Sequence, residues 1–279
     1  MSTNEARAVL VTGGGTGLGK ATALRFAREG ARVAVCGRRE EVLADAAAAI
    51  RAGGASDVAT FSCDVREDDQ VMAMAEALHT KWGPLDVLVN NAAGNFVCPA
   101  EKLTTRGWKA VIEIVLNGTF FCSRSFGRRM IEARKGDGKA RSIVNIVADY
   151  AWGAGPGVVH SASAKAGVLA MSRTLAVEWA RHGIRVNAVS PGPFRSEGTD
   201  KNLWLDDALA EDVRRSIPMG RYTTAEEVAE AIAFLADEAR AAYITGACLP
   251  VDGGHWLSGT HLGFLEAIER GSARGKTSS

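Results

Sequence analysis

The sequence predicts an α/β protein with a doubly wound parallel sheet of about seven strands and helices on both faces. Short runs of Val, Ile and Leu alternate with longer Ala-rich stretches, and regular β–α alternation is typical of parallel sheets. The runs are apolar throughout, as expected of strands that are covered on both faces. A glycine-rich turn directly follows the first run. In such sheets a ligand binds at the carboxyl ends of the strands.

The expected elements follow one another without interruption. Strands are predicted at 8–12, 32–36, 58–62, 85–90, 142–147, 184–189 and 247–251. Helices are predicted over about 18–29, 40–52, 67–82, 105–134, 161–182 and 225–237. Asn117 and Gly118 interrupt the fourth helix, and because both are poor helix formers, a local kink or a packing requirement should explain them.

Composition excludes several classes of function. Lys and Arg number 33 against 32 Asp and Glu, so the net charge of +1 offers no electrostatic footprint for nucleic acid or an anionic membrane. The five cysteines are scattered, without a CxxC or Cys/His cluster, so neither a metal site nor a disulfide framework is expected. The first strand begins at about residue 8 and no apolar run reaches the roughly 18 residues of a membrane span, so a cytoplasmic protein is expected.

The turn TGGGTGLGK at 12–20 predicts a dinucleotide-binding site. Glycine lets the backbone turn sharply and approach a pyrophosphate closely, and the helix that follows supplies N–H donors and a positive dipole end. The strand–turn–helix context disfavours the alternative of a merely tight turn. The chain, 1–279, is then one Rossmann-type dinucleotide-binding domain, with the polar segment 194–222 as a substrate lid. The predicted cofactor contacts in the turn are Gly13, Gly15, Thr16, Gly17, Leu18 and Gly19.

The second strand ends in CGRR, where enzymes that use NAD often place an acidic residue for the ribose hydroxyls. Arg38 lies there instead, and a guanidinium can fork onto a 2′-phosphate that a carboxylate would repel. NADPH is therefore the expected cofactor; the alternative is that Arg38 and Arg39 only solvate the next helix. After the third strand, Asp64 and Val65 are expected at the adenine, although Asp64 is also suited to cap the next helix.

Two further stretches lie at strand ends. The fourth strand leads into NNAAGNF, whose small residues leave room for a flat cofactor beside Asn91 and Ala92. Asn95 is either a donor to a developing oxyanion or a turn asparagine. The stretch 143–165 brings a loop with Tyr150 to a helix that presents Ser161 and Lys165 one turn apart, so a phenol, a hydroxyl and an ammonium should converge there. Asp149 and His160 flank the site that these three groups form, as proton relays or, more commonly, as caps.

The order of these motifs resembles the short-chain dehydrogenase/reductase family over about residues 8–258. The motifs that carry the resemblance are TGGGTGLG, NNAAG, a mid-helix Asn117, Lys165 in a Ser/Ala-rich helix, SPGP and VDGG. The family usually places a tyrosine four residues before the lysine and a serine 13 residues before that tyrosine, yet Ser161 and Ala148 stand here. The resemblance implies assembly as a homotetramer and nicotinamide contacts at Pro191, Gly192, Pro193 and Phe194.

The arrangement with the tyrosine displaced to position 150 is similar to that of one branch of the family, the NADPH-dependent 2,4-dienoyl-CoA reductases. That branch also carries NNAAGNF and SASAKAG. The resemblance implies catalytic positions at Tyr150, Lys165, Asn95, Ser161 and Asn117. It implies contacts with an acyl-CoA thioester at Arg66, Phe96, Thr104 and Tyr150, although Arg66 is a surface arginine in the simpler interpretation.

The chemistry agrees with this displacement. A dienoyl thioester takes hydride at a remote alkene carbon, and negative charge collects on the thioester oxygen, where Tyr150 and Asn95 would donate hydrogen bonds. With an ordinary phenol pKa near 10 Tyr150 is a neutral donor, and Lys165 is expected to lower that pKa. The expected reaction yields a 3-enoyl-CoA in the β-oxidation of unsaturated fatty acids. The alternatives are a trans-2-enoyl-thioester reductase, a 3-oxoacyl or carbonyl reductase, and a non-enzymatic NADP-binding sensor, the last supported by Ser161 in the usual tyrosine position.

Overall fold

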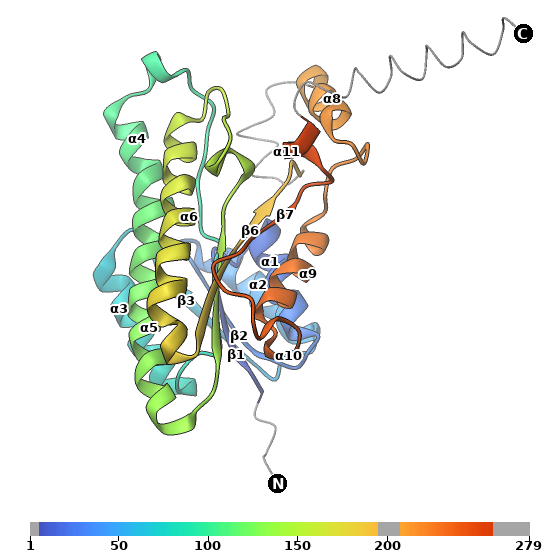
Figure 1. Ribbon diagram of the computed structural model, residues 1–279. Coiled ribbons are helices and arrows are strands. Elements are labelled where there is room, and N and C mark those ends of the chain that lie inside the picture. Colours follow the sequence, from blue (N-terminus) through green and yellow to red (C-terminus); the bar gives the residue numbers. More distant parts are fainter. Residues whose placement is uncertain (1–5, 195–206, 259–279) are drawn as a thin grey trace, which may run out of the picture.

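Seven parallel strands form the centre of the protein, in the order β3-β2-β1-β4-β5-β6-β7 (Figure 1). The computed structural model describes residues 6–194 and 207–258. The strand order reverses between β1 and β4, which is where a doubly wound sheet opens its ligand crevice. The predicted fold class is confirmed. The strands are β1 (Ala8–Thr12), β2 (Arg32–Gly37), β3 (Asp57–Ser62), β4 (Val87–Asn90), β5 (Arg141–Ile146), β6 (Ile184–Pro191) and β7 (Cys248–Val251).

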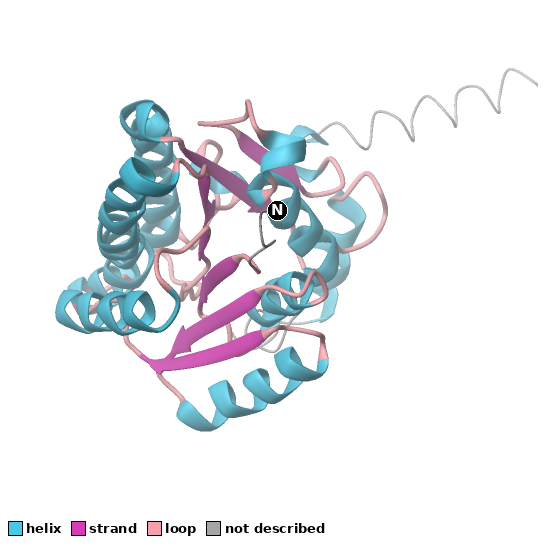
Figure 2. Ribbon diagram, turned by 90° about the horizontal axis from the view of Figure 1, so that it is seen from below, coloured by secondary structure: helices cyan, strands magenta, loops and turns pink. Residues whose placement is uncertain are grey.

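Helices cover both faces of the sheet (Figure 2). Successive strand residues face opposite layers: Val9 and Val11 pack toward α1, α2 and α9, whereas Ala8 and Leu10 pack toward α3 and α5. This two-sided burial explains why the strands are apolar throughout. One layer holds α1 (Gly17–Ala27), α2 (Glu40–Ala52) and α9 (Ala225–Ala236), and the other holds α3 (Asp68–Trp82), α4 (Thr105–Ile112), α5 (Gly118–Asp137) and α6 (Val159–Trp179).

The helix predicted over 105–134 is divided by a π-helical segment, η2 (Glu113–Asn117), between α4 and α5. The expected interruption is therefore confirmed. Gly118 has a packing reason as well, because a Cβ there would lie 2.8 Å from Val65 Cγ2. Because glycine has no side chain, α5 can approach Val65, which lies in the loop between β3 and α3.

Short elements complete the chain, and among them only η4 (Ala180–His182) falls within a helix predicted from the sequence, 161–182. α8 and α11 lie together beyond the carboxyl end of the sheet, where Ser258 Oγ donates to Ser216 O at 3.0 Å (Figure 1). The predicted lid, 194–222, falls partly outside the described residues. These elements are η1 (Ala100–Lys102), η3 (Asp149–Ala151), η4 (Ala180–His182), α8 (Asp207–Ser216), α10 (Glu238–Ala241) and α11 (His255–Ser258).

No helix in the described ranges combines the length and the apolar character that crossing a membrane requires. Within 6–194 and 207–258, no three His, Cys, Asp or Glu side chains gather closely enough to hold a metal ion.

Candidate active site

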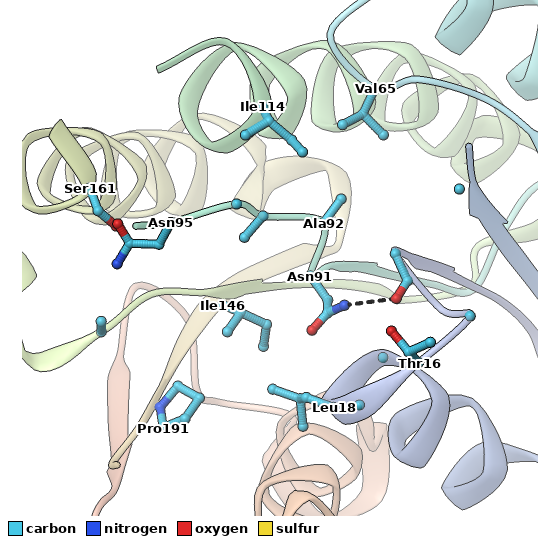
Figure 3. A pocket seen from close by; sticks show the side chains of 18 of the residues that line it. Thr16, Leu18, Val65, Asn91, Ala92, Asn95, Ile114, Ile146, Ser161 and Pro191 are labelled. Atoms are coloured by element: carbon cyan, nitrogen blue, oxygen red, sulfur yellow. Dashed lines mark hydrogen bonds between the residues drawn. The ribbon is translucent and has the colours of Figure 1, made fainter. Parts of the chain in front are cut away.

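A pocket of about 730 Å³ opens at the carboxyl ends of the strands, between the glycine-rich turn and the η3 loop. Figure 3 shows Leu18 and Pro191 on one wall and Val65 and Ile114 on the opposite wall. Both walls are apolar and leave a slot between them, which suits a flat ring system. The predicted residues that line the pocket are Gly13, Gly15, Thr16, Gly17, Leu18, Gly19, Arg38, Asp64, Val65, Asn91, Ala92, Asn95, Tyr150, Ser161, Lys165, Pro191, Gly192, Pro193 and Phe194.

Other predicted residues do not line this pocket, namely Arg66, Phe96, Thr104 and Asn117. The Arg66 guanidinium forks onto both carboxylate oxygens of Asp64. Phe96 packs against another ring, and Thr104 caps α4 by accepting a hydrogen bond from a backbone N–H at 3.1 Å. Asn117 ends the π-helical segment. Contacts of these residues with an acyl-CoA remain predictions.

The glycine-rich turn has the form that a pyrophosphate requires. Gly13 and Gly17 have φ of 64° and 51°, a region that favours glycine, and a Cβ on Gly19 would lie 2.3 Å from Gly13 O. The N-cap residue of α1, Thr16, makes no side-chain capping bond, and no acidic residue occupies the first turn. The amino end of α1 therefore offers N–H donors to an anion, and these residues fit a dinucleotide.

Asn91 fixes this turn from the neighbouring strand. Its Nδ2 donates to Thr12 O at 2.9 Å and to Gly13 O at 3.3 Å, and Figure 3 shows the amide pointing toward the turn. The Thr12 hydroxyl accepts from the backbone N–H groups of Asn91 and Ala92 at 3.0 and 2.9 Å. The predicted contact residues after β4 thus also hold the turn in its shape.

The pocket wall at the end of β2 is cationic. Arg38 and Arg39 both line it and are exposed, and they directly follow Gly37, where enzymes that use NAD often have an acidic residue. Asp64 lies opposite, and its pKa is lowered mainly by the hydrogen bond from Arg66, with a further contribution from the charge of Arg38. The helix-cap alternative for Asp64 is not realised, because α3 begins at Asp68, after Glu67 in the N-cap position. This end of the pocket suits a phosphate on the adenine ribose.

The other end of the pocket brings the predicted phenol, hydroxyl and amide together. Tyr150 Oη lies 3.1 Å from Ser161 Oγ, and Asn95 Nδ2 lies 3.5 Å from Tyr150 Oη. Lys165 Nζ donates to Ile146 O at 2.5 Å, and burial lowers its pKa to about 8. Three segments supply these groups: the loop after β4, η3 and α6.

The Tyr150 phenol is a neutral donor because burial raises its pKa. The nearby Asp149 carboxylate acts in the same direction, while hydrogen bonds with Ser161 and Asn95 only partly oppose it. The expectation that Lys165 lowers this pKa is therefore wrong, since desolvation of the phenolate is the larger effect. The neutral form persists throughout the physiological pH range.

The pocket also contains His255, which reasoning from the sequence missed. Its Nδ1 lies 2.9 Å from Asp149 Oδ2, while Asp149 Oδ1 accepts from the Tyr150 N–H at 2.9 Å. A signal existed, because this histidine directly follows VDGG at the carboxyl end of the last strand. His160 is fully buried against Phe96, with ring centroids 4.4 Å apart, and it does not line the pocket.

Comparisons with known proteins agree with this geometry. The model of the protein family described as enoyl-(acyl carrier protein) reductase matches residues 13–255. The probable (2E)-enoyl-CoA-producing 2,4-dienoyl-CoA reductase of Bacillus subtilis is 49% identical over 255 residues, which cover 91% of this chain and 98% of that protein. The probable (3E)-enoyl-CoA-producing 2,4-dienoyl-CoA reductase 3 of Caenorhabditis elegans is 38% identical over 95% of this chain and 86% of that protein. A short chain dehydrogenase structure from Bacillus anthracis has 47% identity and a TM-score of 0.78, and the match covers 89% and 96% of the two chains.

Proposed function

Since the chain belongs to the short-chain dehydrogenase/reductase family, we propose that it is an NADPH-dependent 2,4-dienoyl-CoA reductase. The observation that carries the proposal is the meeting of Tyr150 with Ser161 and Asn95, at 3.1 and 3.5 Å. The phenol comes from η3 rather than from α6, where the family's usual tyrosine would stand. Two relatives whose names carry this activity support the same substrate class.

In this proposal NADPH, when bound, supplies the hydride. The Tyr150 phenol and the Asn95 amide then donate hydrogen bonds to the thioester oxygen as it gains negative charge. Such preorganised donors stabilise the transition state because they need no reorganisation as the charge develops. Lys165 binds the nicotinamide ribose, and Ser161 orients the phenol through its hydroxyl. Protonation of the α-carbon gives a 3-enoyl-CoA, whereas protonation of the γ-carbon would give a 2-enoyl-CoA.

The preference for NADPH rests on the end of β2. Arg38 and Arg39 line the pocket there, at the place where enzymes that use NAD often have an acidic residue. A guanidinium binds a 2′-phosphate through parallel hydrogen bonds.

The remaining parts of the site are proposed from the family resemblance. Arg66, Phe96 and Thr104 contact the acyl-CoA, Asn117 supports the reaction centre from the π-helical segment, and 194–222 closes over the substrate. The chain assembles as a homotetramer in the cytoplasm and acts in the oxidation of unsaturated fatty acids.

A trans-2-enoyl-thioester reductase is the second candidate, because the matching family model is described as an enoyl-(acyl carrier protein) reductase. Such an enzyme also stabilises a thioester enolate. A carbonyl reductase is disfavoured, because Ser161 stands where that chemistry places its tyrosine.

The test is NADPH consumption with dienoyl-CoA, 2-enoyl-CoA and 3-oxoacyl-CoA offered side by side, followed by identification of the double-bond position in the product. We expect turnover of the dienoyl thioester with formation of a 3-enoyl product. Brisk turnover of the 3-oxoacyl thioester without dienoyl turnover would refute the proposal. Turnover of the 2-enoyl thioester alone would select the second candidate, and a 2-enoyl product would correct the site of protonation.

A further inference from the structure

The η3 loop and the segment after β7 are joined twice beside the pocket. Asp149 Oδ2 lies 2.9 Å from His255 Nδ1, and the rings of Trp152 and Trp256 meet edge to face with centroids 5.7 Å apart. Asp252 Oδ2 accepts from the Trp256 N–H at 2.9 Å, which fixes the short helix that carries the histidine. The His255 imidazole is therefore held in place on the pocket wall next to the Tyr150 loop.

The contact between His255 and Asp149 leaves the second ring nitrogen of His255 available to a molecule bound in the pocket. Nδ1 of His255 is committed to Asp149, and no described residue forms a hydrogen bond with Nε2. The side chains of His255 and Asp149 are 26% and 24% exposed, so protons exchange with solvent. An imidazole with a carboxylate on one nitrogen and a pocket beside it is a common form of general acid.

We propose, on the basis of the proposed function, that His255 is the acid that protonates the α-carbon of the reduced substrate. Hydride adds to the remote alkene carbon, and an electron pair moves through the diene onto the thioester oxygen held by Tyr150 and Asn95. When the enolate collapses, this pair forms the new C–H bond with the proton of His255 Nε2. The N–H bond breaks, the imidazolium becomes a neutral imidazole, and solvent returns the proton.

The other ionisable groups of the pocket suit this step less well. Burial raises the pKa of Tyr150, which already serves the oxygen, and the Lys165 ammonium donates to a backbone carbonyl. Burial also raises the thiol pKa of Cys36 to about 12 and of Cys63 to about 11. By contrast, the hydrogen bond with its carboxylate partner raises the pKa of His255 above its ordinary value and so stabilises the imidazolium relative to the neutral ring.

The sign of the pH dependence follows from the groups that face the ring. Asp149 from η3 and Asp252 from its own segment both favour the charged form of His255. The acid is therefore protonated below its raised pKa, and the rate of protonation falls as pH rises through that pKa. Burial lowers the pKa of Lys165 to about 8, so loss of its charge would also lower the rate as pH rises. Variants are therefore needed to assign the alkaline limb of the pH–rate profile, the range in which the rate falls with rising pH, to one of the two groups.

The experiment measures, against pH, the single-turnover rate at which the protonated enoyl-CoA product forms from dienoyl-CoA, for the full chain and three variants. In His255→Gln we expect the rate to fall about 10²–10⁴-fold, which is the usual contribution of a general acid. We also expect the fall of the rate that deprotonation of His255 causes at high pH to disappear from the pH–rate profile. Asp149→Asn keeps an amide oxygen for the Tyr150 N–H but removes the charge, so the limb should move to lower pH. NMR titration of the ring in the cofactor-free protein should show the same downward shift. The matched control is His79→Gln, an exposed position on α3 outside the pocket lining.

The outcomes separate the two proposals. If the wild-type protein reduces the dienoyl thioester and His255→Gln keeps its rate and its alkaline limb, only the role of His255 is refuted. An Asp149→Asn profile that does not move also refutes this role. If the wild-type protein fails to reduce the dienoyl thioester, the proposed function falls and this role falls with it. Far-UV circular dichroism of His255→Gln that matches the wild-type spectrum verifies that the variant is folded.

Discussion

The position of Tyr150 determines which substrate atom its phenol can serve. A phenol presented by α6 would stand beside the carbon that receives hydride, as ketone reduction requires. Here η3 presents it, and the hydroxyl meets Ser161 Oγ at 3.1 Å with the Asn95 amide at 3.5 Å. Because burial raises its pKa, the phenol remains a donor and does not become a base at neutral pH. In the proposed function, the displaced phenol therefore stabilises a remote oxyanion.

Removal of the phenol tests this assignment. Tyr150→Phe should lower kcat for the dienoyl thioester about 10²–10³-fold, because loss of one oxyanion donor typically costs that much. Steady-state kinetics with NADPH measure the effect. Tyr243→Phe, at a fully exposed tyrosine, is the matched control and should behave as wild type. Nearly full activity of Tyr150→Phe would show that another group holds the oxygen.

The guanidinium of Arg38 provides a second test, on the cofactor. Arg38→Ala should raise KM for NADPH about 10–100-fold while KM for NADH changes little, since a charge-assisted hydrogen bond contributes about 1.5–3 kcal/mol. Arg51→Ala, an exposed position at the end of α2, is the control. Equal changes for both cofactors would argue against contact with a 2′-phosphate.

Among the elements, the divided helix α4–η2–α5 shapes the pocket. Ile114 in the π-helical segment lies on the same wall of the pocket as Val65, and Gly118 lets α5 approach Val65 closely. A π turn re-aims the side chains that follow it, and such turns often lie at functional sites. The irregular helix thus sets the position of one wall of the pocket.

Two alanine substitutions in α5 should have opposite effects on stability. Gly118→Ala should lower the free energy of unfolding by about 1–3 kcal/mol, because the new Cβ would lie 2.8 Å from Val65 Cγ2 in a packed interior. Gly136→Ala, with nothing within 4 Å, should raise it by up to about 1 kcal/mol through helix propensity. Urea unfolding at one protein concentration measures both. A stabilised Gly118→Ala protein would contradict the packing account.

In the whole molecule, the cofactor site joins the two halves of the sheet. The turn after β1 and the cationic end of β2 lie on one side of the strand reversal, and the groups after β4 and β5 lie on the other. A ligand that spans this crevice contacts both halves and binds only the folded chain. Cofactor binding and global stability are therefore coupled.

NADPH should consequently stabilise the protein against unfolding. At about 100 times its Kd, a ligand that binds only the native state adds about 2.7 kcal/mol to the free energy of unfolding. NADH at the same concentration should add less, because it lacks the 2′-phosphate that the wall with Arg38 and Arg39 would bind. Urea titrations at fixed protein concentration compare the two, and equal stabilisation would contradict the cofactor preference.

Local patterns were sufficient to predict the strands, the glycine-rich turn and most of the pocket lining. Apolar runs and glycines determine strands and turns through interactions between residues that are close in the sequence. The carboxyl ends of parallel strands then necessarily meet at one edge of the sheet. These rules placed Gly13, Asn91, Tyr150 and Lys165 at the same site. They did not predict the helix α8, because its residues fall within 194–222, the segment that was expected to form a substrate lid.

Only the tertiary structure revealed what depends on contacts between distant segments. The Asp149–His255 pair joins residues 106 positions apart, so the sequence around His255 could place it near the pocket but could not show that it meets Asp149. The raised pKa of Tyr150 likewise comes from burial, which a charge count along the chain could not supply. Secondary structure and the cofactor turn follow from local backbone and side-chain preferences, whereas desolvation and partner choice follow from packing of the complete fold.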